Sequence, residues 1–261
     1  MERRDPFFWC AAFSGVILVA IIVLPLTELC TSPSLADLKT SFSDMEVQRA
    51  IRLSLMTSCS AALIAFVLGT PLAYILARYH FLGKRLVEGI IDLPIVIPHP
   101  VVGIAILGIV GRNHWFGRVL SDMGIRIMGN PLGIIVVLTF VSLPFYIHSA
   151  RNGFESISPR LEKVSRSLGA SMMRTFFTIT CPLAWRSMVA GVIMSCARAI
   201  SEFGAVVVVA YHPMTAPVLI YERYEGYGLK YSQPVAVWLV LVCLVLFVVL
   251  RMITLGKASN S

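Results

Sequence analysis

Long apolar stretches alternate with short polar segments along the chain. Six windows contain no Asp, Glu, Lys or Arg, and each is 19 to 25 residues long. Because an α-helix rises about 1.5 Å per residue, roughly 20 apolar residues cross the hydrocarbon core of a bilayer, which is about 30 Å thick. The pattern therefore predicts helices that span a membrane. The windows are 6–27, 53–77, 93–111, 127–150, 203–221 and 231–250.

These windows predict an all-α membrane protein with about six transmembrane helices, in which a single membrane domain fills residues 1–261. The fifth span takes in the apolar residues before Arg198 as well as those after Glu202. That choice leaves 211–221 as an apolar loop. The predicted spans are 7–27, 52–78, 90–111, 131–150, 186–210 and 232–251.

Composition supports the membrane class. The chain is 57% apolar and 14% charged, with a mean hydropathy of +0.81, whereas a soluble domain contains about 25% charged residues. The first window follows Arg3 and Arg4, as a signal peptide would, but its apolar core is too long for one, so we interpret it as a span. The six cysteines show no C-x-x-C spacing, which favours packing roles over a metal site or disulfides.

Lysine and arginine indicate the orientation. Six spans place both termini on one side, and with the termini in the cytoplasm the inner segments hold thirteen Lys and Arg residues against eight in the outer segments. Cytoplasmic loops contain an excess of these residues. We therefore expect a multi-pass protein of the cell membrane with both termini cytoplasmic. The net charge of +8 then reflects inner loops that face anionic lipid or a partner protein, with no need for nucleic acid.

The longest predicted inner segment, 151–185, interrupts the apolar pattern. Ser158 and Pro159 indicate a helix start, because serine caps helices and proline suits their first turn. Gly169 indicates the end of this helix, because glycine adopts left-handed backbone without strain. Pro182 is expected to break or kink the chain before the fifth span.

The helix after Ser158 is predicted to be amphipathic. Leu161, Val164 and Leu168 recur at helical spacing, and Ser165 is expected on the same face, whereas the basic residues lie off it. Two interpretations remain open at this point. The helix lies on the bilayer surface, or it fills a groove on a cytoplasmic partner.

Motifs of enzymes are missing from the sequence. The pairs Gly83-Lys84 and Gly256-Lys257 lack the upstream glycine of a phosphate-binding loop, and neither H-E-x-x-H nor G-x-S-x-G occurs. We therefore predict no catalytic residue and no metal site in this chain. An ion-coupled secondary carrier and an intramembrane enzyme remain as alternative classes.

The inner segment resembles the cytoplasmic "EAA" loop of ABC-importer permeases, whose pattern is E-A-A-x3-G-x9-I-x-L-P. The glycine, isoleucine and proline of the pattern are kept, but the triplet reads Lys-Val-Ser, a glutamate stands one residue early, and a cysteine replaces the leucine. The resemblance implies that the short helix docks into a separate ATPase. The residues it assigns to this coupling are Ser158, Pro159, Leu161, Glu162, Lys163, Val164, Ser165, Leu168, Gly169, Ile179 and Pro182.

Stretches elsewhere resemble the molybdate/tungstate permeases of the archaeal type. They are GTPLAYILAR, DLPIVIPHPVVGIAIL, ARNGFESISPRLEKVSRSLGAS and ARAISEFGAVVVVAYHPMTAPVLIYERY, so the resemblance covers nearly the whole chain after about residue 50. It implies a type I ABC-importer permease with a cytoplasmic coupling helix, which moves a tetrahedral oxyanion, molybdate or tungstate, into the cytoplasm. Sulfate/thiosulfate permeases share the layout, and a permease of that kind is the alternative.

The resemblance also implies partners. Two copies of the chain would pair with two ATP-binding subunits and one extracytoplasmic oxyanion-binding protein. ATP and Mg would be bound by the ATP-binding subunits, and the chain itself would hold no cofactor. The outer loop 211–231 is rich in tyrosine, which indicates either an aromatic belt at the membrane surface or a docking site for the binding protein.

Ionisable residues and prolines inside the predicted spans are functional candidates, because charge is costly in lipid. Arg198 and Glu202 stand at i,i+4, so a self-neutralising structural pair is the favoured interpretation and assistance to a crossing anion is the alternative. Pro98 and Pro100 flank His99, so the third span must be kinked or unwound there. Irregular backbone is tolerated in a membrane where it lines a cavity. These five residues form a candidate translocation pathway.

Overall fold

The computed structural model describes residues 6–111 and 114–255. Arg3, Arg4, Arg112 and Lys257, which count in the predicted charge bias, lie outside the described residues. Every regular element in the described part of the chain is a helix. The elements are α1 (Pro6–Thr31), α2 (Leu35–Ser43), α3 (Met45–Arg78), α4 (Lys84–Val96), α5 (His99–Val110), α6 (Trp115–Asp122), α7 (Pro131–Glu155), α8 (Pro159–Ser167), α9 (Met172–Thr175), the π-helix η1 (Phe176–Thr180), α10 (Cys181–Ile200), α11 (Gly204–Val209), α12 (Ala216–Tyr227) and α13 (Leu229–Leu255).

Within the described ranges, five helical segments are long and apolar enough to cross a membrane, and the pair α4 and α5 makes up to six if its two helices count as one span. This pair is bent by 113° at its break. The prediction of an all-α protein with about six spans is therefore confirmed. The five segments are Phe8–Thr31, Met45–Arg78, Pro131–Glu155, Met172–Ile200 and Leu229–Val249.

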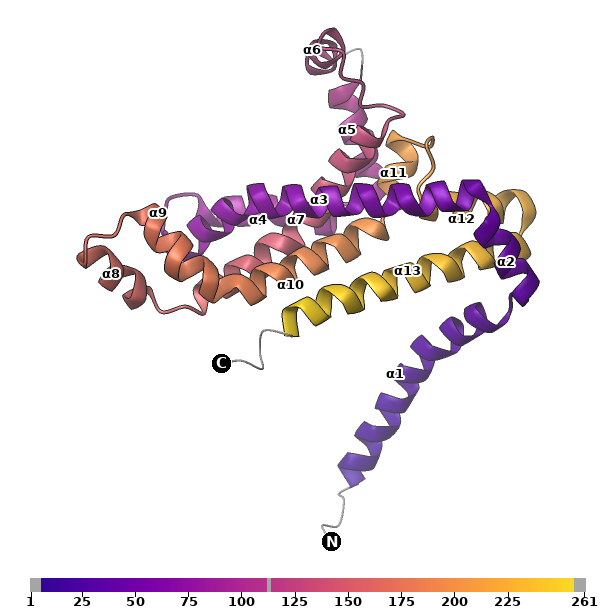
Figure 1. The fold of residues 1–261 in the computed structure, drawn as a ribbon, viewed down its shortest axis with the longest axis horizontal. Coiled ribbons are helices and arrows are strands. Elements are labelled where there is room, and N and C mark those ends of the chain that lie inside the picture. The colour runs from indigo at the N-terminus through magenta and orange to yellow at the C-terminus, as the bar shows by residue number, and fades with distance from the viewer. Residues whose placement is uncertain (1–5, 112–113, 256–261) are drawn as a thin grey trace.

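The core forms where α3, α7 and α10 lie side by side along the long axis of the molecule (Figure 1). Tyr146 and Phe154 of α7 are fully buried there, among small residues of α3 such as Ala65 and Ala73. At Gly69 a Cβ atom would come within 2.8 Å of the Tyr146 ring. Small residues let transmembrane helices approach closely, and close packing is what holds such helices together in lipid.

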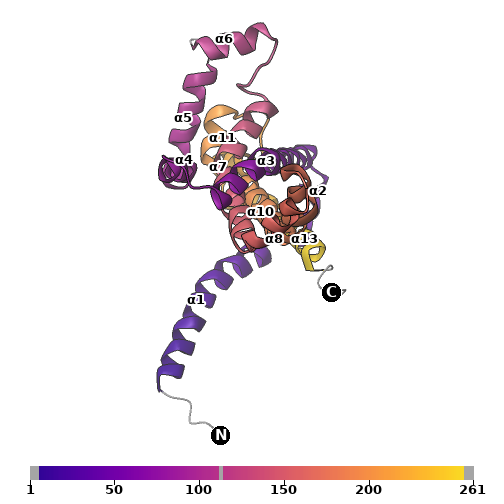
Figure 2. The ribbon, with the colours of Figure 1, turned by 90° about the vertical axis from the view of Figure 1, so that its left-hand side faces the viewer.

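Two parts of the chain project from this core. Helix α1 points away from the other helices (Figures 1 and 2), and none of its apolar window is buried. Helices α5 and α6 rise from the bundle on another side, with α11 against α5 (Figure 2). The 113° bend between α4 and α5 produces this second projection.

The expected fifth span of 186–210 is interrupted, which corrects the prediction. Helix α10 ends at Ile200, and a separate short helix, α11, begins at Gly204. The side chain of Glu202 in the break accepts a hydrogen bond from the backbone N–H of Ala205 at 3.0 Å. A carboxylate that bonds a free N–H at the start of a helix favours a new helix over continuation of the old one.

Two smaller expectations, a break at Pro182 and an apolar loop over 211–221, are wrong. The chain does not break at Pro182, because the π-turn of η1 precedes it and the proline enters in the first turn of α10, where no N–H is needed. The apolar loop expected over 211–221 contains the start of α12 instead. The N–H of Ala216 donates to the Ser54 hydroxyl of α3 at 2.8 Å, so a neighbouring helix satisfies the start of α12.

Candidate functional site

Two breaks in the helices meet at one group of polar side chains. The break between α4 and α5 ends at His99, and the break between α10 and α11 follows Arg198 and contains Glu202. Arg198 Nη2 donates to His99 Nε2 at 2.6 Å and to Glu202 Oε2 at 2.7 Å. We call these three residues the helix-break cluster. The i,i+4 ion pair predicted from the sequence is present, and it has a third member from another span.

The members of the helix-break cluster differ in exposure. Glu202 is 1% exposed, Arg198 20% and His99 37%. The carboxylate is therefore buried with a partner on each oxygen, whereas the cation reaches the surface. Apart from Nη2, the only guanidinium bond within the described residues is a long one from Nη1 to Ser201 at 3.4 Å. A guanidinium has five N–H donors in a planar fork that fits an oxyanion with two bonds at once.

The prolines shape the backbone around this cluster. Pro98 caps α5 and Pro100 lies in its first turn, which is the position that proline tolerates. A Cβ on Gly204 would lie 3.2 Å from His99 Cβ and 3.3 Å from Pro100 Cδ, so α11 starts directly against the start of α5. The structure thus brings together all five residues of the predicted pathway.

A second series of polar pairs lies between α4 and α7. Asp92 of α4 lies 2.6 Å from His148 of α7, and one turn earlier Glu88 lies 2.8 Å from Arg151, which also pairs with Glu155 at 2.7 Å. The i,i+4 spacing of Glu88 and Asp92 was the available signal, because it places both acids on one face of α4. These pairs hold α4 against α7.

The polar segment between α7 and α10 has the predicted local structure. The Ser158 hydroxyl accepts from the N–H of Arg160 at 3.4 Å, and Ser171 caps α9 by accepting from the N–H of Arg174 at 3.2 Å. Gly169 has φ +87°, so α8 ends in left-handed backbone. The predicted helix start and the predicted glycine turn are confirmed.

The two faces of α8 are arranged differently from the expectation. Leu161, Val164 and Leu168 are exposed. Ser165, however, does not share their face, because its hydroxyl bonds to that of Thr175 at 3.1 Å on the inner side. The reason is that α9 and η1 fold back against α8 and offer polar side chains there.

Glu162 is the main inward-facing residue of α8. Its carboxylate accepts from Arg78 Nε at 2.9 Å, from the Tyr74 hydroxyl at 3.2 Å and from the Thr180 hydroxyl at 2.9 Å. The Arg78 and Glu162 side chains are 9% and 12% exposed. We call these four residues the α8 clamp. The sequence placed Glu162 in the loop but gave no signal for its partners, which are distant in the chain.

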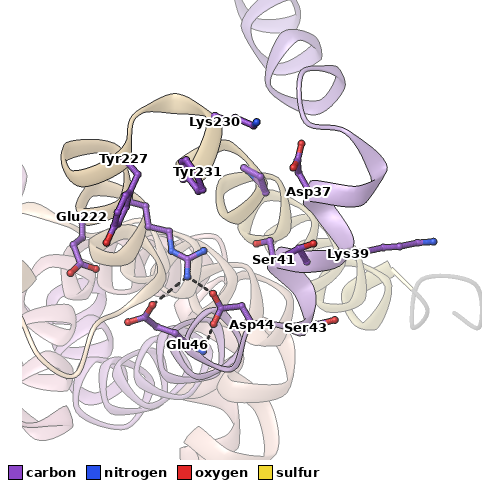
Figure 3. A pocket seen from close by; sticks show the side chains of 13 residues that line it. Asp37, Lys39, Ser41, Ser43, Asp44, Glu46, Glu222, Tyr227, Lys230 and Tyr231 are labelled. Carbon is purple, nitrogen blue, oxygen red and sulfur yellow. Dashed lines mark hydrogen bonds and ion pairs between the residues drawn. The ribbon is translucent and has the colours of Figure 1, made fainter.

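A cavity of about 1030 Å³ lies at the opposite end of the bundle from α8, between α2, α12 and the starts of α3 and α13 (Figures 1 and 3). Arg223 of α12 lines it and bonds to Asp44 at 2.5 Å and to Glu46 at 3.3 Å. Partial burial raises the pKa of Asp44, but the hydrogen bonds from Arg223 and from the Glu46 N–H outweigh it, so this pKa lies below its ordinary value. Tyr227, the last residue of α12, and Tyr231, in the first turn of α13, line the same cavity, so this part of the predicted outer loop is helical.

Among residues 6–111 and 114–255, no group of three or more His, Cys, Asp or Glu side chains could hold a metal ion.

Comparison with known proteins gives several matches. Residues 69–256 match the family described as binding-protein-dependent transport system inner membrane component. A molybdate/tungstate transport system permease protein of Pyrococcus furiosus is 44% identical over 263 residues, 100% of both chains. One from Methanocaldococcus jannaschii is 42% identical over 91% of this chain and 92% of its own. A sulfate transport system permease protein of Synechocystis is 29% identical over 91% and 86% of the two chains.

Solved structures share the fold. A chain of a bacterial alginate ABC transporter, in complex with a periplasmic protein that holds an alginate pentasaccharide, has a TM-score of 0.77 at 16% identity and covers 98% of this chain and 96% of that one. A chain of the inward-facing MetNI methionine ABC transporter has a TM-score of 0.65 at 19% identity, over 80% and 95%. At such low identity these similarities show the fold alone, which is that of type I ABC-importer permeases.

Proposed function

Because the chain belongs to the family of binding-protein-dependent transport system inner membrane components, we propose that it carries molybdate or tungstate across the cell membrane into the cytoplasm. Proteins of this family are transport permeases and not enzymes, and a separate subunit hydrolyses ATP. The substrate follows the name of the relative that is 44% identical along the full length. The family works with ATPase subunits and a binding protein. In our proposal two copies of this chain pair with two ATP-binding subunits and one extracytoplasmic oxyanion-binding protein.

The observation that carries the proposed mechanism is the meeting of two broken helices at Arg198. Discontinuous helices in transporters often form substrate sites, because irregular backbone is tolerated in a membrane only where it is packed in protein or lines a cavity. In the helix-break cluster the exposed part of Arg198 offers free donors to a tetrahedral dianion. The buried Glu202 offsets part of the arginine charge, so the anion is attracted without being held tightly. Pro98 and Pro100 keep the backbone open at this point.

In this mechanism α5 and α11 move together and open or close the path. A Cβ on Gly103 of α5 would come within 2.8 Å of both the Ala205 carbonyl and Val208 Cβ, so the two helices are in close contact. Each is joined to the bundle by a short non-helical break, after Val96 and after Ile200 respectively. Two packed helices on two short breaks form a unit that can tilt about them.

The α8 end of the bundle is cytoplasmic in this proposal, and so are both termini. The exposed Leu161, Val164 and Leu168 then form the surface that docks into the ATPase. Coupling involves the residues from Ser158 to Pro182, in which Gly169 sets the direction of α8 and Ile179 lies in the π-helix that leads to α10. The opposite end, with its cavity around Arg223, faces the binding protein.

Transport by purified components tests the proposal. The chain is reconstituted in proteoliposomes with a candidate ATPase, ATP is enclosed, and radiolabelled molybdate is supplied outside with its binding protein. We expect uptake only when ATP, the ATPase and the binding protein are all present. Uptake by the chain alone with an ion gradient would assign it to the secondary carriers instead. Competition by excess sulfate at the same binding protein would support the sulfate permease alternative, which the 29% identical relative suggests.

A further inference from the structure

We propose that Glu162 is a positioning residue that ties α8 to α3, so that movement of the docked ATPase reaches α3 through side chains as well as reaching α10 through the backbone. The proposal rests on the proposed function, because it takes α8 to be the helix that docks into the ATPase. It goes beyond that function by naming the residue that transmits the movement and the helix that receives it.

The contacts of Glu162 join three elements. Arg78 Nε and Nη2 both lie 2.9 Å from Glu162 Oε1, and the Tyr74 hydroxyl lies 3.2 Å from Oε2, so both oxygens are bonded to α3. Thr180 of η1 donates to Oε1 at 2.9 Å. Arg78 also donates to the carbonyl of Ile157, just before α8, at 3.1 Å. A single carboxylate therefore connects α8, the end of α3 and the start of the α10 span.

The burial of this network makes it a stiff connection. Arg78 and Glu162 are 9% and 12% exposed, so water competes little for their bonds. Charge-assisted hydrogen bonds are short and directional, and they strengthen where the surroundings exclude water. Apolar contacts, by contrast, have no preferred direction. When α8 moves, the clamp is therefore expected to move the end of α3 with it.

The two faces of α8 have complementary roles. Leu161, Val164 and Leu168 face outward and are free to receive a partner. Glu162 and Ser165 face inward and bond to α3, η1 and α9. Leu161 of the outer face and Glu162 of the inner face are adjacent in sequence, so a displacement of the outer face also displaces the inner face.

Two routes leave α8 for the membrane. The backbone route passes Gly169, α9 and η1 and enters α10 without a break at Cys181. The side-chain route passes Arg78 into α3, which runs from Met45 to Arg78 and packs against both α7 and α10. Because Thr180 bonds to the same carboxylate as Arg78, the clamp makes α3 and α10 move together.

The test compares Glu162→Ala with Glu155→Ala in the complete transporter. Glu155 is a matched control because it is a glutamate near α8 that also pairs with an arginine, yet its side chain is 42% exposed. We expect Glu162→Ala to keep normal amounts of co-purified ATPase, since the docking face is unchanged. The number of anions taken up per ATP hydrolysed is expected to fall by about tenfold, within the range found for residues that modulate coupling between sites. Glu155→Ala is expected to match the wild type.

Two further variants distinguish loss of the connection from misfolding. Glu162→Gln keeps the shape and the acceptor oxygens, and we expect a smaller loss of about threefold in uptake per ATP. Combining Glu162→Ala with Arg78→Met is expected to be no worse than Glu162→Ala alone, because both changes remove the same connection.

Two results would overturn the proposal. Unchanged uptake per ATP in Glu162→Ala and Glu162→Gln would show that the backbone route suffices. Loss of the ATPase from these variants would show that Glu162 belongs to the docking surface instead. Failure of the wild-type chain to recruit any ATPase is a different outcome, since it would contradict the proposed function itself.

Discussion

The helix-break cluster and the α8 clamp each centre on an arginine paired with a glutamate, but their surroundings differ. In the α8 clamp both side chains are nearly buried and α3 and α8 are regular helices. In the helix-break cluster only Glu202 is fully buried, Arg198 reaches the surface, and two interrupted helices meet. In our proposal the buried network of the α8 clamp transmits movement. The more open helix-break cluster can exchange a partner, which is what passage of an anion requires.

Removing Arg198 should have the largest effect. Arg198→Met deletes the guanidinium that we expect to contact the anion, and hydrogen bonds to charged groups contribute about 1.5–3 kcal/mol, so uptake is expected to fall by at least about tenfold. Assembly with the ATPase should persist. Arg186→Met is the matched control, because Arg186 is an exposed arginine of the same helix. Normal uptake by Arg198→Met in proteoliposomes would remove Arg198 from the pathway.

Glu202 should have a different effect from Arg198. Glu202→Gln removes the charge that offsets Arg198, so the anion is expected to stay bound for longer while its uptake falls by about tenfold or less. Retention of labelled molybdate after gel filtration of the purified transporter measures this directly. The wild type is expected to retain none. Equal retention by both proteins would mean that Glu202 only caps α11 through the Ala205 N–H.

Gly169→Val tests whether the direction of α8 matters for transport. With φ +87° at this position, a β-branched residue costs about 1–2 kcal/mol, so α8 is expected to turn away from its docking direction. Uptake should fall while the spans remain inserted. Gly83→Val is the matched control, since Gly83 has φ +89° and, like Gly169, no atom within 4 Å of an added Cβ. Equal losses in both variants would point to general strain instead of lost coupling.

Leu168→Asp tests the same docking face without altering the backbone. Leu168 is exposed at the end of α8, and a charge placed in an apolar groove is costly. The ATPase is expected to co-purify in reduced amount, whereas binding of molybdate to the separate binding protein stays unchanged. Full recovery of the ATPase and of transport would favour a helix that lies on the bilayer.

Much of this architecture could be predicted from local patterns. The spans follow from the length of apolar windows, and the ends of α8 follow from the preferences of Ser158 and Gly169 for particular backbone shapes. The pair Arg198 and Glu202 was visible because i,i+4 neighbours share a helix face. Each of these signals lies within a few residues of the feature that it predicts.

The features that could not be predicted depend on distant segments. Arg78 and Glu162 are 84 residues apart, and His99 and Arg198 are 99 residues apart. The local sequence around one residue of such a pair therefore does not indicate the other. The break after Ile200 was not predicted either, because the apolar sequence on both sides favours one continuous span. The break depends on the bond from the Ala205 N–H to the buried Glu202 side chain. At Pro182 a break was predicted that is absent, because the π-turn before it places the proline in the first turn of α10.

The pair of Arg223 and Asp44 is expected to have the smallest effect of those considered. Asp44, bonded to Arg223, is 35% exposed, and exposed pairs contribute about 1 kcal/mol or less. Asp44→Asn is expected to lower thermal stability slightly at neutral pH. Because the folded pKa of Asp44 lies below 3.8, the contribution is complete above that pH and is lost as the pH falls through the folded pKa. Thermal unfolding of the two proteins should therefore converge in acid, and a constant difference down to low pH would contradict this.

The separate roles of the two clusters are tested most directly by following α5 while ATP is added. A fluorophore is placed at position 104, where Ile104 is exposed, after the six native cysteines have been replaced, and emission is recorded in the assembled transporter. We predict that ATP changes the emission in the wild type and in Arg198→Met, where movement persists although the anion no longer passes. We predict a clearly smaller change in Glu162→Ala, where only the backbone route through η1 and α10 still carries the movement toward α5. The same response in both variants would contradict the division between passage at Arg198 and transmission at Glu162.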